Sequence, residues 1–340
     1  MSTTLYTSGY GGKIHTLSFT PTTTPPTLTC TSTIPAGTAP TWLLLHPNLP
    51  VLYSVDEFSS PTGVLSAYKI SQTGGPLELI SQTPSGGDGP VHLALSGDKR
   101  TMYVANYGGA TVASVGIKED GDFLKEREPM VFKFEGKGPR EDRQEAPHPH
   151  GVYIDPTVQF LVAADLGTDT LKVWSISNGK MDRLEDFAVK AGSGPRHLSF
   201  SIHNQKTLLY LVSELSNEIS TFEFVYPTLP LISPKLVSLQ LAVSVLPLDR
   251  PTPGPWTAAE LSLTPSHSHL FISNRSPDDP KPTSDSDVIA VFEIQADGTL
   301  KVPHVGLEVK GGRGLRDFRM SPKKQGILGM EEAGKWVAVA

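Results

Sequence analysis

The chain has 340 residues, a formal net charge of −6 and one cysteine, Cys30. A single cysteine excludes an internal disulfide framework and favours a reducing, cytoplasmic location. The acidic balance argues against a nucleic-acid partner, no apolar run is long enough for a membrane span, and the N-terminus lacks the basic and apolar regions of a signal peptide.

A repeat with β-strand periodicity runs along the chain. Each copy has a Gly/Pro-rich lead, an alternating apolar strand, a turn, a second strand that ends in a polar residue, and a third strand. The openers of the copies occupy residues 39–57, 89–107, 148–166, 194–214, 255–275 and 313–325. Their spacing of roughly 45–60 residues is typical of one four-stranded propeller blade per repeat.

We therefore predict one all-β domain over residues 1–340, a seven-bladed β-propeller. The segment LYTSGYGGKIHTLSF (5–19) resembles the second half of a repeat and supplies the seventh blade. The sixth opener (313–325) is not followed by a whole blade, so the closing blade is expected to be incomplete at the C-terminus. A β-sandwich is the alternative fold, but it would not need the same pattern six times.

The start of the first strand carries unlike residues from one copy to the next. Aligned on the following turn, the first position holds Thr41, Val91, His150, Arg196, Ala259 and Arg316. The next position holds Trp42, His92, Gly151, His197, Glu260 and Asp317. Structural positions of a repeat keep one residue type, so this charged and aromatic variety indicates a binding site.

The end of the second strand contains one conserved-looking position and one variable position. The first holds Asp56, Asn106, Asp165, Ser213 and Asn274, which we interpret as turn caps that accept backbone N–H bonds. The second holds Glu57, Tyr107, Leu166, Glu214 and Arg275. Its variation again favours a role in binding.

From this register we predict four catalytic residues, His150, Arg196, Glu214 and Arg275. Substrate-binding residues are expected around them: His92, His197, Glu57, Glu260 and Arg316. Arginines that face a channel mouth suit a carboxylate or phosphate, and a histidine beside a carboxylate supplies acid–base chemistry near neutral pH. We expect a small anionic substrate, no nucleic-acid or membrane partner, and a monomer.

Plainer interpretations stay open for several of these residues. His148 and His150 would share a strand face as a zinc pair, but Pro149 interrupts strand pairing and the sequence suggests no third ligand. We expect no metal and no other cofactor. His150 could instead be a turn residue, and Glu214 a wall residue paired with an arginine. The segment 139–147 (PREDRQEAP) is interpreted as a solvated loop.

Several segments resemble the seven-bladed lactonase family: GPRHLSFSI, LVSELSNEIS, HGVYIDP, AADLGTDTL and FISNR. That family includes propeller-type 6-phosphogluconolactonases and fungal 3-carboxy-cis,cis-muconate lactonizing enzymes. The resemblance runs from Tyr6 to about Pro322, and the chain departs from the family by ending early. It implies a site of His150 in PHG, Arg196 in GPRH, Glu214 in SEL and Arg275 in SNR.

The resemblance favours a lactonase of carbohydrate metabolism that hydrolyses 6-phosphogluconolactone. In this hypothesis Arg196 and Arg275 bind the phosphate or polarise the carbonyl, His150 is the general base, and Glu214 orients it or acts as the partner acid. A muconate-type cycloisomerase and a non-catalytic propeller scaffold are the alternatives. A calcium-dependent gluconolactonase would need clustered carboxylate ligands, and the arginines argue against it.

Overall fold

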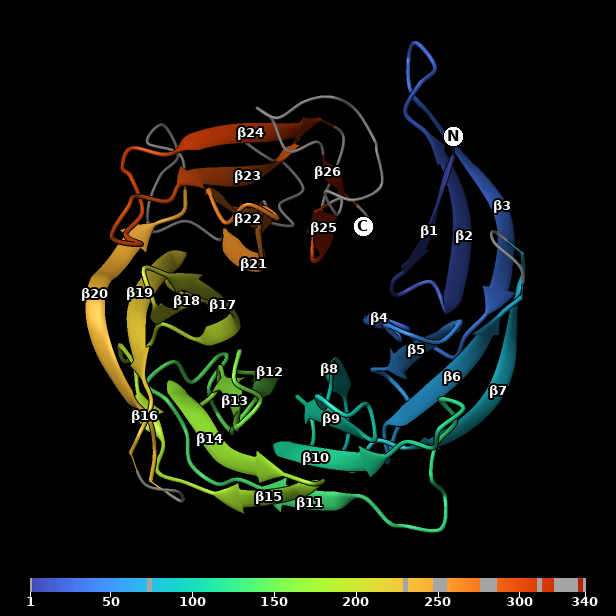
Figure 1. The fold of residues 1–340 in the computed structure, drawn as a ribbon, viewed down its shortest axis with the longest axis horizontal. Helices are drawn as coiled ribbons and strands as arrows, with labels where there is room; N and C mark the ends of the chain where they lie inside the picture. Colours follow the sequence, from blue (N-terminus) through green and yellow to red (C-terminus); the bar gives the residue numbers. More distant parts are fainter. Residues whose placement is uncertain are drawn as a thin grey trace. The chain divides into compact units, whose positions relative to one another are not determined.

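In the computed structural model, residues 2–71, 75–228, 232–246, 256–275, 286–310, 314–320 and 336–338 are described. Their regular structure consists entirely of β-strands, as the sequence predicts (Figure 1). A helix that could cross a membrane is absent from these ranges. The chain divides into two compact units. Unit 1 comprises Met1–Gly136, Ala146–Ile154 and Ser177–Lys180, and unit 2 comprises Lys137–Glu145, Asp155–Ile176 and Met181–Ala340.

Unit 1 contains three antiparallel sheets in chain order, followed by strand β12. The sheets are β1-β2-β3, β4-β5-β6-β7 and β8-β9-β10-β11. Their strands are β1 Thr3–Ser8, β2 Lys13–Thr20, β3 Thr27–Pro35, β4 Leu43–Leu45, β5 Val51–Asp56, β6 Val64–Ile70, β7 Leu77–Pro84, β8 Pro90–Leu95, β9 Thr101–Asn106, β10 Thr111–Gly116, β11 Met130–Lys133 and β12 Pro149–Ile154. The predicted N-terminal half-repeat is thus the sheet β1-β2-β3.

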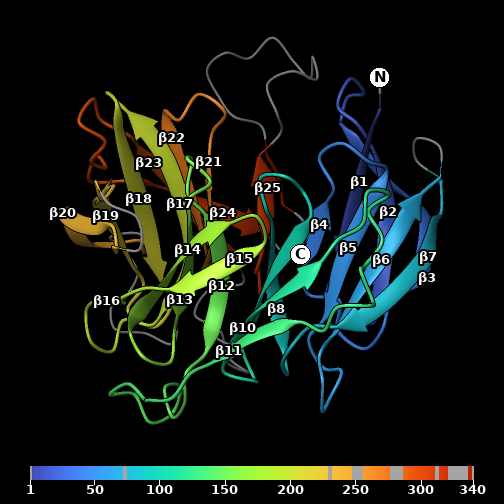
Figure 2. The ribbon, with the colours of Figure 1, turned by 60° about the horizontal axis from the view of Figure 1, so that its bottom comes forward.

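Unit 2 continues the same pattern. It contains β13-β14-β15 with β16 paired to β14, then β17-β18-β19-β20, β21-β22-β23-β24 and the pair β25-β26 (Figure 2). Its strands are β13 Phe160–Asp165, β14 Thr170–Ser177, β15 Lys180–Arg183, β16 Phe187–Ala188, β17 Pro195–His203, β18 Lys206–Ser213, β19 Glu218–Val225, β20 Lys235–Ser244, β21 Thr257–Leu263, β22 His269–Arg275, β23 Ser286–Glu293, β24 Val305–Lys310, β25 Phe318–Met320 and β26 Trp336–Ala338. The last sheet has two described strands, and residues 321–325 of its predicted opener lie outside the described ranges.

Consecutive sheets touch through their first strands or, at β13, through a second strand, which is the blade arrangement of a β-propeller. In unit 1, β4 contacts β8 and β8 contacts β12; in unit 2, β13 contacts β17, β17 contacts β21 and β21 contacts β25. A four-stranded meander cannot bury both of its faces alone, so stacking on the neighbouring sheet supplies the core. The predicted all-β propeller is confirmed at this level.

The second strand of a blade is buried on both faces because neighbouring sheets cover it. Every residue of β5, β9 and β13 is buried. One contact recurs between blades: the hydroxyl of Tyr53 on β5 donates to the carbonyl of Gly121 at 2.7 Å, and that of Tyr210 on β18 donates to Gly298 at 2.9 Å. A buried tyrosine thus joins each of these sheets to a hairpin of the next.

The predicted turn caps are confirmed at two positions. Asp56 accepts the N–H groups of Thr38 at 2.9 Å and Ala39 at 2.8 Å, and Asp165 accepts that of Gly167 at 3.0 Å. The asparagines act in the opposite sense. The side-chain amides of Asn106 and Asn274 donate to the carbonyls of Ser85 and Val245. The same position of the repeat therefore accepts hydrogen bonds from backbone N–H groups where it is Asp, and donates to backbone carbonyls where it is Asn.

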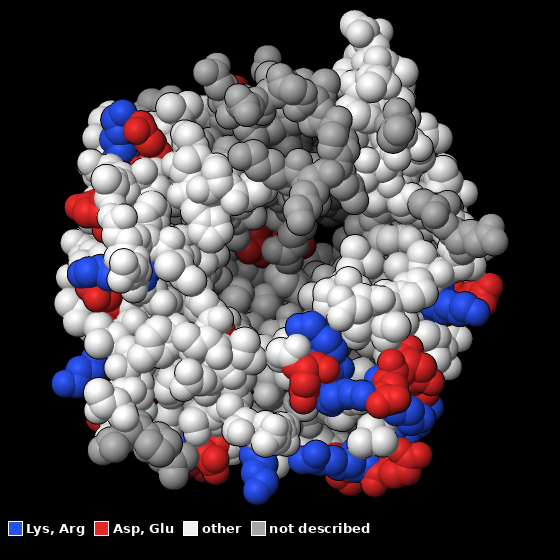
Figure 3. Space-filling model, viewed as in Figure 1, with Lys and Arg blue, Asp and Glu red and all other residues white. Residues whose placement is uncertain are grey.

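Charged side chains on the face shown in Figure 3 lie interspersed, with blue atoms beside red ones. The described residues include surface ion pairs such as Arg100–Glu119. A nucleic-acid-binding face would instead carry a patch of clustered Lys and Arg side chains.

Candidate active site

The GPR segment forms a turn that brings Arg196 to the beginning of β17. Gly194 has a φ of +63°, and a Cβ atom there would lie 2.5 Å from the Cγ atom of Leu215, so glycine is required at this position. The N–H of Glu214 donates to the carbonyl of Gly194 at 2.8 Å. The turn before Arg196 is thus bound directly to the segment that carries Glu214.

A buried carboxylate fixes this turn from the other side. Asp169 accepts the N–H of Gly192 at 2.7 Å and the N–H of Gly194 at 2.8 Å. Two backbone donors on one carboxylate are charge-assisted bonds, which are stronger than neutral ones. Asp169 therefore positions the turn, and through it Arg196.

β-Bulges orient the charged residues at the start of the first strands. The pairing of β17 with β18 shifts between Pro195 and His197, where Arg196 lies. The pairing of β21 with β22 shifts between Ala258 and Leu261, a stretch that includes Glu260. A bulge adds an unpaired residue and redirects the side chains around it. The variable register positions of the repeat coincide with these bulges.

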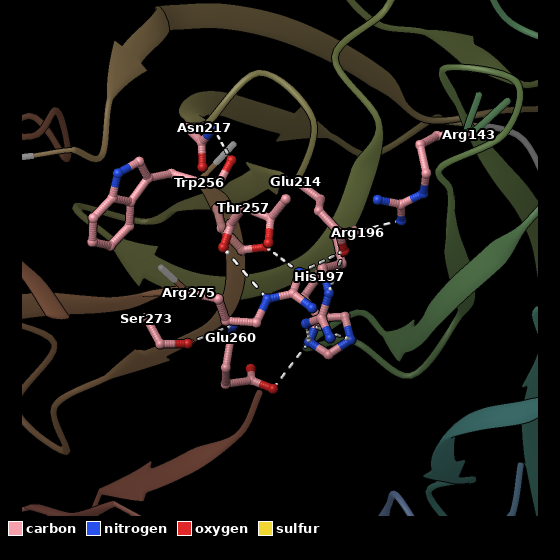
Figure 4. Close-up of polar contacts among 11 residues, drawn as sticks. Arg143, Arg196, His197, Glu214, Asn217, Trp256, Thr257, Glu260, Ser273 and Arg275 are labelled. Atoms are coloured by element: carbon pink, nitrogen blue, oxygen red, sulfur yellow. Dashed lines mark hydrogen bonds and ion pairs between the residues drawn. The ribbon is translucent and has the colours of Figure 1, made fainter. Parts of the chain in front are cut away.

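Three guanidinium groups converge on the carboxylate of Glu214 (Figure 4). Its Oε2 atom accepts a hydrogen bond from Nε of Arg196 at 2.9 Å and lies 3.1 Å from Nη2 of Arg275. Its Oε1 atom accepts from Nη2 of Arg143 at 2.8 Å. The side chains of Glu214 and Arg196 are each 4% exposed and that of Arg275 is 8% exposed, so the cluster is largely shielded from water.

Backbone carbonyls hold Arg275 at the end of β22. Its Nη2 and Nε atoms donate to the carbonyls of Ala258 at 3.2 Å and Thr257 at 3.5 Å. Burial lowers the pKa of Arg275 to about 10; Glu214 opposes this shift, and the nearby cations Arg196 and Arg316 add to it. The guanidinium is still a cation at neutral pH, although burial and the neighbouring cations outweigh the stabilising effect of Glu214 on its charge.

His197 and Glu260 form a buried pair beside Arg196. The Nδ1 atom of His197 lies 2.9 Å from Oε2 of Glu260. The Nη1 atom of Arg196 lies 3.3 Å from Nδ1 and 3.5 Å from Nε2 of this imidazole, so it approaches both ring nitrogens. Glu260 is fixed in turn, because its Oε1 accepts the N–H of Leu261 and its own N–H donates to Ser273. The imidazole of this pair thus gives Arg196 a second buried neighbour besides Glu214.

The remaining predicted residues of unit 1 are His150, His92 and Glu57. His150 lies on β12, is buried, and meets the ring of Tyr107 edge-on with centroids 5.6 Å apart. His92 packs between the rings of Trp42 and Tyr153, and its Nδ1 atom accepts the N–H of Val152 at 3.3 Å. Glu57 follows β5 and is half-buried.

In unit 2 the structure brings together three of the four predicted catalytic residues, Arg196, Glu214 and Arg275. His197 and Glu260, predicted to bind substrate, lie beside them, and Arg316 acts on Arg275 through its charge. The described residues contain no group of three His, Cys, Asp or Glu side chains that could hold a metal ion. The chemistry available in unit 2 is that of a polarising, anion-binding arginine cluster.

Sequence reasoning missed two contributors. Arg143 lies in the segment 139–147 predicted to be a solvated loop, and that prediction is wrong for Arg143 and for Gln144, which is fully buried. Asp169 lies in a turn, outside the strand positions that were aligned between repeats, so the alignment could not identify it. The polar composition of the loop gave no sign that one of its two arginines would reach a buried carboxylate.

Comparison with known proteins gives one consistent result. A family model described as lactonase, 7-bladed beta-propeller, matches residues 1–339. An Arthroderma benhamiae protein named "Probable 6-phosphogluconolactonase" is 33% identical over 88% of this chain and 70% of its own length. The 6-phosphogluconolactonase of Bacillus subtilis is 30% identical over 88% of this chain and 79% of its own length.

A solved structure points the same way for the fold. A Bacteroides fragilis protein superimposes with a TM-score of 0.78 at 26% identity, over 94% of this chain and 85% of that protein. The names of the relatives support lactone hydrolysis, and the cycloisomerase alternative gains no support from them.

Proposed function

Because the chain belongs to the family described as lactonase, 7-bladed beta-propeller, we propose that it hydrolyses a sugar lactone, specifically 6-phosphogluconolactone. The observation that carries the proposal is the convergence of Arg143, Arg196 and Arg275 on the single carboxylate of Glu214. The guanidinium groups outnumber the carboxylate that they share, and a cluster of this kind suits an anionic ligand. A phosphorylated lactone and its oxyanion supply such charge.

Lactone hydrolysis requires water to add to the carbonyl carbon and the ring oxygen to leave. We assign the proton of the attacking water to His150, which the family resemblance implies as general base. Arg196 or Arg275 then stabilises the oxyanion of the tetrahedral intermediate. When this intermediate collapses, the ring oxygen leaves and takes up the proton that His150 accepted, so the base is regenerated and the product is the open-chain acid. The proposed steps use only side chains and water.

The contacts of Glu214 support a third role beside the two expected from the sequence, which were to orient His150 or to act as the partner acid. Both carboxylate oxygens already accept guanidinium N–H groups, at 2.8 Å on Oε1 and 2.9 Å on Oε2. A carboxylate whose two oxygens both accept guanidinium N–H groups is stabilised in its ionised form, so it is a poor proton donor. It also fixes the positions of the arginines that bind it. We therefore infer that Glu214 holds the arginines at fixed spacing.

The broader predictions enter the proposal unchanged. We infer a single seven-bladed domain, because the family model spans both units. We also retain as predictions a cytoplasmic location and a monomeric state.

The test is the hydrolysis of freshly generated 6-phosphogluconolactone above its spontaneous rate, measured with the wild type and with His150→Ala. We expect an excess rate in the wild type and a loss of roughly 10²–10⁴-fold in the variant. No excess rate from folded wild-type protein would overturn the proposal, and a fully active variant would remove His150 from the chemistry.

A further inference from the structure

The three arginines around Glu214 are not equivalent in accessibility. The side chains of Arg196 and Arg275 are 4% and 8% exposed, whereas that of Arg143 is 36% exposed. Arg196 and Arg275 share the Oε2 atom of Glu214, and Arg143 binds Oε1. In Figure 4, Arg143 approaches the carboxylate from the side opposite Arg275. One guanidinium therefore borders solvent while two are enclosed.

The loop that carries Arg143 is a built element and not a flexible excursion. Gln144 is completely buried, and its side-chain amide donates to the carbonyl of Leu166 at 2.8 Å. Its Oε1 atom accepts the N–H of Arg140 at 3.1 Å. The backbone N–H groups of Arg143 and Gln144 both donate to the carbonyl of Arg140. The turn 140–144 is thus anchored beside β13 and directs Arg143 inward.

The neighbouring arginine of the same turn points elsewhere. Arg140 is exposed and pairs through Nε and Nη2 with Asp142, at 3.2 and 3.1 Å. Two arginines three residues apart thus meet different carboxylates, one on the surface and one in the cluster. This contrast supplies a matched control.

We propose that Arg143 is the specificity-determining residue that binds the phosphate of the substrate, by exchanging its contact with Glu214 for the incoming dianion. A guanidinium forms the same two-pronged bonds with phosphate as with carboxylate, and a dianion offers it more charge. After this exchange Arg196 and Arg275 stay bound to Glu214, where they are available to the lactone carbonyl of the substrate. For the identity of its ligand the inference rests on the proposed function.

Binding of the two reaction products separates this role from catalysis. Isothermal titration calorimetry with 6-phosphogluconate and with gluconate compares the wild type, Arg143→Gln and Arg140→Gln. We expect Arg143→Gln to weaken 6-phosphogluconate roughly 10- to 100-fold, the range of one charge-assisted contact, and to change gluconate by less than about twofold. Arg140→Gln should bind both products as the wild type does.

Three results would overturn the inference: equal weakening of both products by Arg143→Gln, no weakening of either, or a wild type that does not prefer the phosphorylated product. Arg143→Lys guards against misfolding, since it keeps the charge without the fork and should bind 6-phosphogluconate with intermediate affinity. A wild type that discriminates between the products yet hydrolyses no lactone would refute the proposed function alone. An active enzyme whose Arg143→Gln variant binds normally would refute this inference alone.

Discussion

Two blades with the same local architecture have different chemistry. Strand β8 of unit 1 and strand β17 of unit 2 each begin with a bulge, between Pro90 and His92 and between Pro195 and His197. In β8 the bulged residue is Val91, and the histidine that follows packs between two aromatic rings. In β17 the bulged residue is Arg196, and the histidine that follows pairs with Glu260.

The residue after the second strand decides the difference. In unit 1 this position is Tyr107, whose ring stacks on His148 with centroids 4.2 Å apart. In unit 2 it is Glu214, which gathers three guanidinium groups. Both blades have the same bulge at the start of the first strand and a side chain at the same position after the second strand. The candidate site therefore lies where charges at these positions are complementary within one blade and its neighbour.

The largest effect is expected from removing the bulge arginine. Arg196→Gln takes away a buried cation proposed to stabilise the oxyanion, so kcat/KM for 6-phosphogluconolactone should fall by about 10²–10³-fold. Val91→Ala changes the equivalent position of unit 1 and should alter kcat/KM by less than about twofold. Initial-rate kinetics on both variants make the comparison, and similar losses in the two would erase the distinction between the blades.

Removing the carboxylate should chiefly cost stability. Glu214→Gln leaves three guanidinium groups with one partner fewer in a shielded site, and we expect the free energy of unfolding to fall by about 3–5 kcal/mol. Urea denaturation measures this loss. The control is Glu218→Gln, because Glu218 pairs at 2.7 Å with Lys190, whose side chain is 59% exposed. A surface pair of this kind should contribute at most about 1 kcal/mol. Equal losses in both variants would show that the arginine cluster is not energetically special.

A smaller effect concerns the pair that supports Arg196. A double-mutant cycle of His197→Gln and Glu260→Gln should give a coupling energy of about 1.5–3 kcal/mol, the range of a buried hydrogen bond to a charged group. Urea unfolding of the wild type, both single variants and the double variant provides the cycle. A coupling near zero would mean that the 2.9 Å contact between His197 and Glu260 contributes nothing to the fold.

The smallest effect is expected at the unit 1 counterpart of Glu214. Tyr107→Phe keeps the ring that stacks on His148, so the free energy of unfolding should change by less than about 1 kcal/mol and kcat/KM by less than about twofold. A loss of activity of about tenfold or more would assign a catalytic role to the Tyr107 hydroxyl. The contrast between the two blades would then have to be redrawn.

Period-two alternation and the spacing of the repeat were sufficient to predict the strands and the stacked blades, because burial of alternate residues dictates both. The same register grouped Arg196, Glu214 and Arg275, since equivalent positions of neighbouring blades are adjacent in a propeller. Arg143 escaped prediction because a loop has no register, and a buried glutamine, Gln144, determines where it points. The donor role of Asn106 and Asn274 was also missed, because an amide can act in either sense.

The most direct test of the account is a crystal structure of the chain with 6-phosphogluconate bound. The account predicts phosphate oxygens within hydrogen-bond distance of Arg143, and the carboxylate of the product at Arg196 or Arg275, with Glu214 still in contact with those two arginines. A ligand bound away from all three guanidinium groups, or a cluster that retains every Glu214 contact with no ligand oxygen beside it, would contradict the account.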